Sequence, residues 1–246
     1  MNETVALMGA SGRVGSRILA ELSRRGHNVT AIARHPENIP TLPGVRAVAG
    51  DANDKTALAG LLRGHDVAAS AVPFAVSDPH ILIDAVRTAG VKRYLVVGGA
   101  GSLEVAPGQI LLDQPDFPAA YKPEAAAGAA FLNLLRRTDD LDWTFLSPSA
   151  LFEPGERTGK FRLGTDQLLT TPQGSSISFE DYAIAFVDEL ENPRHVRQRF
   201  TVGYQRCQRP GRCHAPPSPP APSGLQFRRG GDRAFANAAV CGIPCA

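Results

Sequence analysis

Three glycines near the start of the chain constrain its fold more than any other feature of the sequence. Gly9, Gly12 and Gly15 stand three positions apart in the segment Gly9-Ala-Ser-Gly-Arg-Val-Gly15. This segment follows a short apolar run, Thr4–Met8, and precedes residues 14–25, whose apolar side chains recur at helical spacing. A glycine-rich turn between a strand and a helix is typical of α/β proteins that bind nucleotide phosphates.

Each glycine has its own physical role in such a turn. Gly9 permits a tight exit from the strand, Gly12 lets the backbone approach a pyrophosphate, and Gly15 lets the helix pack closely on the sheet. The N-terminus of the helix adds unpaired N–H donors and a positive dipole end. The alternative is a purely structural glycine-rich turn. The residues predicted to bind a dinucleotide here are Gly9, Ser11, Gly12, Arg13, Val14 and Gly15.

The rest of the chain up to residue 204 alternates between strand and helix patterns. Short, almost unbroken apolar strands, such as the one at 93–97, favour a parallel sheet that helices cover on both faces. We therefore predict a doubly wound α/β domain, the Rossmann fold. The expected strands are 4–8, 28–33, 45–49, 66–72, 93–97, 142–146 and 199–203, and the expected helices are 14–25, 55–62, 79–89, 123–137 and 178–191, the last with Ser178 as N-cap. Residues 101–121 are rich in Gly, Pro and Asp and are expected to form a long functional loop.

The end of the second strand bears on which dinucleotide binds. NAD-binding proteins usually place Asp or Glu there, against the ribose hydroxyls. This chain has Arg34, nineteen positions after Gly15. A guanidinium can bind a 2′-phosphate through charge-assisted hydrogen bonds, and Arg13 can add a second one. We therefore expect NADP(H) as cofactor, the alternative being that Arg34 is an ordinary solvated charge.

The remaining cofactor contacts are expected at the carboxyl ends of the other strands, where ligands bind in open α/β sheets. Asp51 can accept a hydrogen bond from the adenine amino group, or it can cap its own turn. Small or apolar residues after the fourth, fifth and sixth strands leave room for ribose and nicotinamide. These residues are Ala71, Val72, Pro73, Gly98, Gly99 and Pro148.

Composition separates the chain into two parts. Residues 205–246 carry six arginines, one acidic residue, all four cysteines and seven of the 20 prolines, whereas residues 1–204 carry 20 basic and 23 acidic residues. We therefore expect one NAD(P)-binding domain over 1–204 and a disordered C-terminal tail over 205–246, which can be appended or out-of-frame sequence. A zinc site in the tail is the rival interpretation, although its cysteines lack the close pairs typical of such sites.

The body of the chain also limits the kinds of partner. A mildly acidic domain gives no reason to expect nucleic acid, and no apolar run is long enough for a bilayer. Residues 1–4 carry no basic charge that would indicate a signal peptide. We expect a soluble, cytoplasmic protein that binds a small-molecule substrate and no metal, and the sequence leaves its oligomeric state open.

Several motifs together resemble a known family. They are Gly9-Ala-Ser-Gly-Arg-Val-Gly15, Ala33-Arg34, Gly50-Asp51, Gly98-Gly99 and Leu146-Ser-Pro148. This set resembles the atypical short-chain dehydrogenase/reductase group, and within it the NAD(P)H-binding proteins related to NADPH-dependent flavin reductase, also called biliverdin-IXβ reductase. The resemblance covers about residues 4–204. It implies NADPH as hydride donor and a flavin, quinone or tetrapyrrole-like acceptor.

The chain departs from this group at the positions that handle protons. Orthodox short-chain dehydrogenases place Tyr and Lys four positions apart on a helix, so that the lysine lowers the pKa of the tyrosine. Here Lys122 follows Tyr121 at once, and Ala125 stands four positions on. Gly99 and Ser149 stand where the flavin reductases resembled have a serine and a histidine. Neither proton-handling scheme therefore transfers intact.

Two functions remain open after these departures. Hydride transfer to a flat conjugated acceptor needs orientation more than a protein acid, which favours a reductase. A catalytically silent NADP(H) sensor, like the NmrA-type regulators that the chain also resembles, is the alternative. A sugar-nucleotide epimerase is disfavoured by the missing Tyr-x-x-x-Lys. Tyr121, Ser102 and Ser149 are the candidate catalytic residues, although hydroxyls of this kind are more often bonded to loop backbone.

Overall fold

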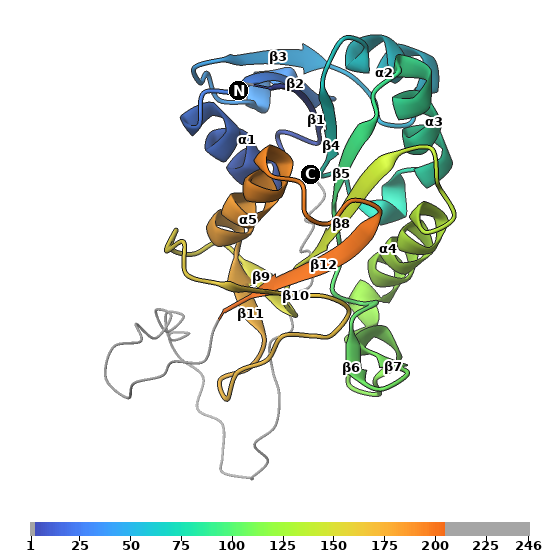
Figure 1. Ribbon diagram of the computed structural model, residues 1–246, viewed down its shortest axis with the longest axis vertical. Helices are drawn as coiled ribbons and strands as arrows, with labels where there is room; N and C mark the ends of the chain where they lie inside the picture. Colours follow the sequence, from blue (N-terminus) through green and yellow to red (C-terminus); the bar gives the residue numbers. More distant parts are fainter. Residues whose placement is uncertain (1–2, 205–246) are drawn as a thin grey trace, which may run out of the picture.

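The structure, a computed structural model, describes residues 3–204 (Figure 1). Its centre is an eight-stranded sheet with the strand order β10-β12-β8-β5-β4-β1-β2-β3. All neighbours in this sheet are parallel except β10, which runs antiparallel to β12 at one edge. The strands are β1 Thr4–Met8, β2 Asn28–Ala33, β3 Val45–Ala49, β4 Val67–Ser70, β5 Arg93–Val97, β8 Asp142–Ser147, β10 Arg162–Gly164 and β12 Gln198–Gly203.

Helices cover both faces of the sheet, as Figure 1 shows. On one face lie α1 (Gly15–Arg24) and α5 (Phe179–Glu191), and on the other lie α2 (Lys55–Leu62), α3 (Pro79–Ala89) and α4 (Lys122–Leu135). The order of the strands reverses direction after β1, because the chain first builds β2 and β3 on one side and then β4, β5 and β8 on the other. The predicted doubly wound Rossmann-type fold is confirmed.

Alternation along the strands supplies both layers with apolar side chains. In β1, Val5 and Leu7 enter the cluster beneath α1 and α5, whereas Ala6 and Met8 enter the cluster beneath α2, α3 and α4. All four are almost completely buried. Successive side chains of a strand point to opposite faces, so a strand covered by helices on both sides must be apolar throughout.

The structure corrects the sequence-based interpretation of residues 101–121. The segment is not a plain loop, because it contains the hairpin β6 (Glu104–Ala106) and β7 (Gln109–Ile110) and two 3₁₀ turns, η3 (Leu111–Asp113) and η4 (Ala119–Tyr121). Three further short strands were not predicted. They are β10 and the parallel pair β9 (Leu151–Glu153) and β11 (Ser176–Ser178).

The ends of α5 and α1 are fixed by local hydrogen bonds, and Ser178 is the N-cap of α5 as predicted. The Ser178 hydroxyl accepts a hydrogen bond from the backbone N–H of Asp181 and so caps α5. The backbone N–H of Gly26, which has a φ of 83°, bonds to the carbonyl oxygen of Ser23 and ends α1. The fourth strand is shorter than expected, since Ala71 and Val72 lie beyond the end of β4. Two further 3₁₀ turns are η1 (Pro36–Asn38) and η2 (Phe74–Val76).

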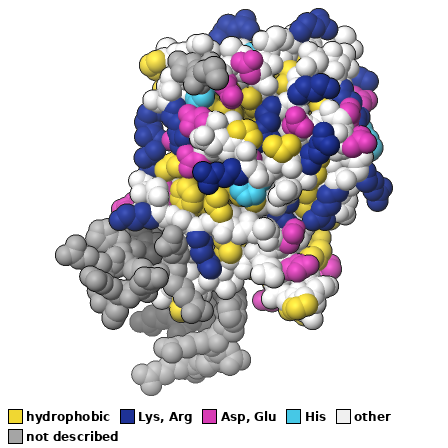
Figure 2. Space-filling model, viewed as in Figure 1, with side chains coloured by type: hydrophobic (Ala, Val, Ile, Leu, Met, Phe, Trp, Pro, Cys, Tyr) yellow, Lys and Arg dark blue, Asp and Glu magenta, His cyan; other side chains and the backbone are white. Residues whose placement is uncertain are grey.

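The surface carries both signs of charge. On the face shown in Figure 2, basic and acidic side chains are interspersed, without a continuous patch of one sign. Within residues 3–204, no helix has both the length and the apolar character needed to cross a membrane. The expectations of a disordered tail or of a zinc site fall on residues 205–246, outside the described part of the chain.

Candidate functional site

A cavity of about 370 Å³ lies at the carboxyl ends of β1, β2, β4 and β5. It is the place where the order of the strands reverses and where open α/β sheets bind their ligands. The cavity brings together most of the residues predicted to bind the cofactor. Those that line it are Gly9, Ser11, Gly12, Arg13, Val14, Arg34, Asp51, Ala71, Val72, Pro73 and Gly98.

The glycine turn has a backbone that side chains would disrupt. Gly9 has a φ of 77°, and a Cβ atom there would come within 2.6 Å of the carbonyl oxygen of Ala71. The backbone N–H of Gly12 donates to the carbonyl oxygen of Gly9 at 3.0 Å. Gly15 does not line the cavity, and a Cβ atom on it would collide with the same carbonyl oxygen of Gly9. Gly15 therefore lets α1 lie close against the end of β1.

The N-terminus of α1 suits an anion. Val14 stands at the N-cap position, and no side chain accepts hydrogen bonds from the first turn there. The N–H groups of Ser16 and Arg17 donate to the carbonyl oxygens of Gly12 and Val14, which leaves those of Val14 and Gly15 for another acceptor. The helix dipole favours negative charge at this end. Since Gly12 leaves the approach open, the turn and the helix together fit the pyrophosphate of a dinucleotide.

The two arginines predicted to bind a 2′-phosphate both line the cavity, in different surroundings. Arg34 is exposed and makes no hydrogen bond or ion pair to any residue within 3–204. The guanidinium carbon of Arg13 lies 5.1 Å from the centre of the Phe179 ring, at the start of α5. This distance is typical of a cation–π contact. Arg34 is therefore the guanidinium available to a ligand at the end of β2.

Asp51 forms the turn that was the alternative to adenine binding. Its Oδ1 accepts a hydrogen bond from the backbone N–H of Asn53 at 2.9 Å, and its side chain still lines the cavity. The Asn53 side chain continues this connection, because it donates to the carbonyl oxygen of Val76 and accepts from the backbone N–H of Asp78. The loop after β3 and the loop after β4 are thereby joined at the rim of the cavity.

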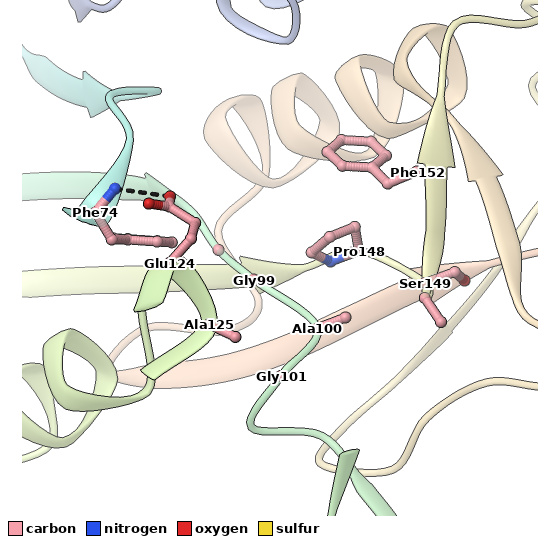
Figure 3. A pocket seen from close by; sticks show the side chains of 11 residues that line it. Phe74, Gly99, Ala100, Gly101, Glu124, Ala125, Pro148, Ser149 and Phe152 are labelled. Atoms are coloured by element: carbon pink, nitrogen blue, oxygen red, sulfur yellow. Dashed lines mark hydrogen bonds between the residues drawn. The ribbon is translucent and has the colours of Figure 1, made fainter. Parts of the chain in front are cut away.

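A second cavity, of only about 20 Å³, adjoins the first one (Figure 3). Phe74, Gly98 and Glu124 line both cavities. The small cavity is otherwise lined by residues without charge, and Gly99 and Pro148 of the predicted set belong to it. Its further lining residues are Ala100, Gly101, Ala125, Ser149, Ala150 and Phe152.

Phe74 and Glu124 are site residues that the sequence analysis missed. The two carboxylate oxygens of Glu124 accept hydrogen bonds from the backbone N–H groups of Phe74 and Ala75, each at 2.8 Å. The Phe74 ring stacks on Phe145 with centroids 6.0 Å apart, and a Cβ atom on Gly128 of α4 would come within 2.9 Å of it. The start of α4 thus holds η2 and its aromatic ring between the two cavities.

The three candidate catalytic residues do not converge on one point. Ser149 is fully buried, and its hydroxyl donates to the carbonyl oxygen of Val202 at 3.0 Å. The hydroxyl of Ser102 accepts from the Arg199 guanidinium at 3.4 Å, and Tyr121 packs in an apolar cluster with Phe117. Neither Ser102 nor Tyr121 lines either of these two cavities. Among residues 3–204 there is also no group of three or more His, Cys, Asp or Glu side chains placed to hold a metal ion.

The fold and the cavity define the class of protein. Residues 9–193 match the family model described as NAD(P)H-binding, and the chain belongs to that family. The resemblance to NAD(P)H-binding proteins is thereby confirmed.

Similar proteins carry different designations. The chain is 40% identical over 209 residues to the uncharacterized protein YwnB of Bacillus subtilis (strain 168), a match that covers 80% of this chain and 97% of YwnB. A candidate epimerase from Bacteroides thetaiotaomicron has 42% identity and a TM-score of 0.79, and the match covers 83% of this chain and 98% of that one. A candidate NADH-flavin reductase from Streptococcus pneumoniae TIGR4 has 36% identity and a TM-score of 0.67, over 83% of this chain and all of that one.

Proposed function

We propose that this protein is an NADPH-dependent oxidoreductase whose substrate is a flat conjugated acceptor: a flavin, a quinone or a tetrapyrrole-like molecule. The observation that carries the proposal is the small cavity, lined by uncharged residues apart from Glu124, which adjoins the large cavity and shares Phe74 and Gly98 with it. When bound, NADPH supplies a hydride, and a proton from water completes the reduction of the acceptor.

The residues that line the large cavity can bind the cofactor. The backbone N–H groups of Ser11, in the glycine turn, and of Val14, at the N-cap of α1, can donate to the pyrophosphate. Arg34 offers a guanidinium to a 2′-phosphate. At the other end, Gly98 lines the cavity, and a Cβ atom there would collide with the Phe145 ring, so the packing against β8 requires a glycine.

The walls of the small cavity can form one side of the acceptor site, which must extend beyond the cavity's own volume of about 20 Å³. Gly99, Ala100 and Gly101 present almost no side-chain volume on one side, and Pro148 presents a rigid apolar ring on another (Figure 3). A planar acceptor can therefore lie across these walls rather than inside the small cavity. Orientation of this kind is the main contribution a protein makes to hydride transfer between two conjugated rings.

A catalytically silent NADP(H) sensor is the second candidate. The specific observation in its favour is that the hydroxyl of Ser149 is bonded to backbone and that Ser102 and Tyr121 lie outside the two cavities. An epimerase, the designation of one structural relative, needs a group that removes and returns a hydroxyl proton. The described residues that line the two cavities include neither tyrosine nor lysine.

The preference for NADPH over NADH tests the proposed cofactor. The dissociation constants of NADPH and NADH are measured for the parent, for Arg34→Asp and for Arg63→Ala, which removes an exposed arginine away from both cavities. Because Arg34 is exposed, we expect about a tenfold preference for NADPH in the parent and its loss in Arg34→Asp only. Equal affinities in the parent, or an unchanged preference in Arg34→Asp, would refute the assignment of this arginine.

Turnover with different acceptors tests the proposed reductase activity. Oxidation of NADPH is followed with flavins, quinones, biliverdins and a sugar nucleotide, in the parent and in Tyr121→Phe. We expect activity with at least one flat acceptor, and rates in Tyr121→Phe within about twofold of the parent, because no tyrosine proton is needed. Tight NADPH binding without turnover would favour the sensor. A collapse of the rate in Tyr121→Phe would show that a tyrosine acts as the acid.

A further inference from the structure

Glu124 is distinguished by its position among the charged groups of the site. Among the described residues that line the small cavity, it is the only ionisable one. The large cavity adds three ionisable residues, Arg13, Arg34 and Asp51, and all three belong to the loops after β1, β2 and β3. Glu124 comes instead from α4 and lines both cavities, so it supplies the charge where they meet.

The carboxylate of Glu124 is held in a fixed place. Each of its oxygens accepts one backbone N–H, from Phe74 and Ala75, and both distances are 2.8 Å. It also lies in the first turn of α4, where the helix dipole favours a negative charge. The side chain is half-buried, so solvent screens its charge only in part.

We infer that Glu124 determines the preference of the site for the oxidised over the reduced cofactor. The inference rests on the proposed function, because it takes the nicotinamide to lie at the junction of the two cavities. The nicotinamide ring is positively charged when oxidised and neutral when reduced. A fixed carboxylate beside it attracts the first form and has no net charge to attract in the second, whereas the rest of the dinucleotide is the same in both.

The size of the effect follows from the surroundings of the carboxylate. Two N–H donors and the end of α4 offset part of its charge, and solvent screens another part. We therefore expect its neutralisation to change the ratio of the two dissociation constants by about three- to tenfold. A tenfold change corresponds to about 30 mV in the potential of a bound two-electron couple. The same preference makes hydride donation from the site more favourable and release of the oxidised product slower.

The test is a measurement of binding that needs no acceptor. Dissociation constants of NADP⁺ and NADPH are measured by calorimetry on the full chain, for the parent, Glu124→Gln, Glu124→Ala, Glu124→Asp and Asp51→Asn. The ratio of the NADP⁺ constant to the NADPH constant should rise about three- to tenfold in the Gln and Ala variants. Glu124→Asp keeps the charge and should stay within about twofold of the parent. Asp51→Asn should leave the ratio unchanged, because it faces the half of the cofactor common to both forms.

The outcomes separate this inference from the proposed function. A purely structural role, in which Glu124 only holds η2, would weaken both ligands equally and leave the ratio unchanged, and that result would overturn the inference. In Glu124→Gln, an amide N–H can face the backbone N–H of Phe74 or Ala75 and disturb the fold. Glu124→Ala has no amide, so it still tests the inference in that case. If neither cofactor form binds the parent, the proposed function fails instead.

Discussion

The substitution Glu21→Gln is expected to destabilise the fold strongly at neutral pH and weakly in acid. Glu21 lies on α1, and its side chain is only 4% exposed. Its carboxylate accepts from Arg25 at 2.8 Å, from two nitrogens of Arg157 at 3.1 Å, and from Arg24. Arg157 belongs to the segment between β9 and β10, so the carboxylate joins α1 to a distant part of the chain.

The magnitude follows from the pKa of this carboxyl. Burial by itself would raise the pKa of Glu21, but the hydrogen bonds from Arg157, Arg24 and Arg25 outweigh burial and lower the pKa from 4.5 to about 2. A shift of this size corresponds to about 3 kcal/mol of stability. Because Arg24 and Arg157 are half-exposed, solvent screening reduces our expectation to about 2 kcal/mol.

The sign of the pH dependence is set by the lowered pKa. A carboxyl with a pKa lower in the folded than in the unfolded state stabilises the fold fully above its unfolded value of 4.5, and the contribution is lost as pH falls toward about 2. The difference in unfolding free energy between the parent and Glu21→Gln should therefore be about 2 kcal/mol at pH 7 and about half of that near pH 3.

Urea unfolding at both pH values measures this difference. Asp84→Asn is the matched control, since Asp84 also lies on a helix and pairs with two basic residues, Lys55 and Arg87, but is 45% exposed. Its substitution should cost no more than about 0.5 kcal/mol. A loss in Glu21→Gln below about 0.5 kcal/mol at pH 7, or the same loss at both pH values, would refute the reasoning.

Two further predictions concern the candidate hydroxyl and the C-terminal segment. Ser149→Ala should lower the unfolding free energy by about 1 kcal/mol, because the carbonyl oxygen of Val202 loses a buried donor. The variant should keep its turnover rate within about twofold of the parent, and a large loss of rate at unchanged stability would contradict this. Deletion of residues 205–246 should leave NADPH affinity unchanged and reduce stability by less than about 2 kcal/mol in thermal unfolding; a larger loss would show that these residues stabilise the domain.

The central elements of the fold could be predicted because their signals are local. Strands such as Arg93–Val97 are short apolar runs next to turn residues, and α5 begins at a serine followed by two acids in the first turn. The hairpin of Glu104–Ala106 and Gln109–Ile110 and the edge strand Arg162–Gly164 have only two or three residues each. Such segments are too short for periodicity, and pairing with the distant strand β12 decides the conformation of the edge strand.

The candidate site likewise contains residues that could be predicted from the sequence and residues that could not. The glycine turn and Arg34 carry a recognisable spacing, so their place beside the large cavity could be anticipated. Glu124 carries no such signal, because an acid in the first turn of a helix is explained by the helix dipole alone. Its contacts are to backbone groups 49 and 50 residues away, and only the packing of α4 against η2 brings them together. The partner of Ser149 is likewise 53 residues away.

The linings of the two cavities come from different stretches of the chain, and this bears on how the protein can diversify. Apart from Glu124 and Phe179, every residue that lines the large cavity lies between 8 and 98, whereas the small cavity takes most of its lining from 98–101 and 148–152. Substitutions in the second set can alter the acceptor while the cofactor half of the site stays as it is. A library randomised at Ala100, Gly101, Ala150 and Phe152, none of which is a predicted cofactor contact, would therefore explore new substrates at little cost to cofactor affinity.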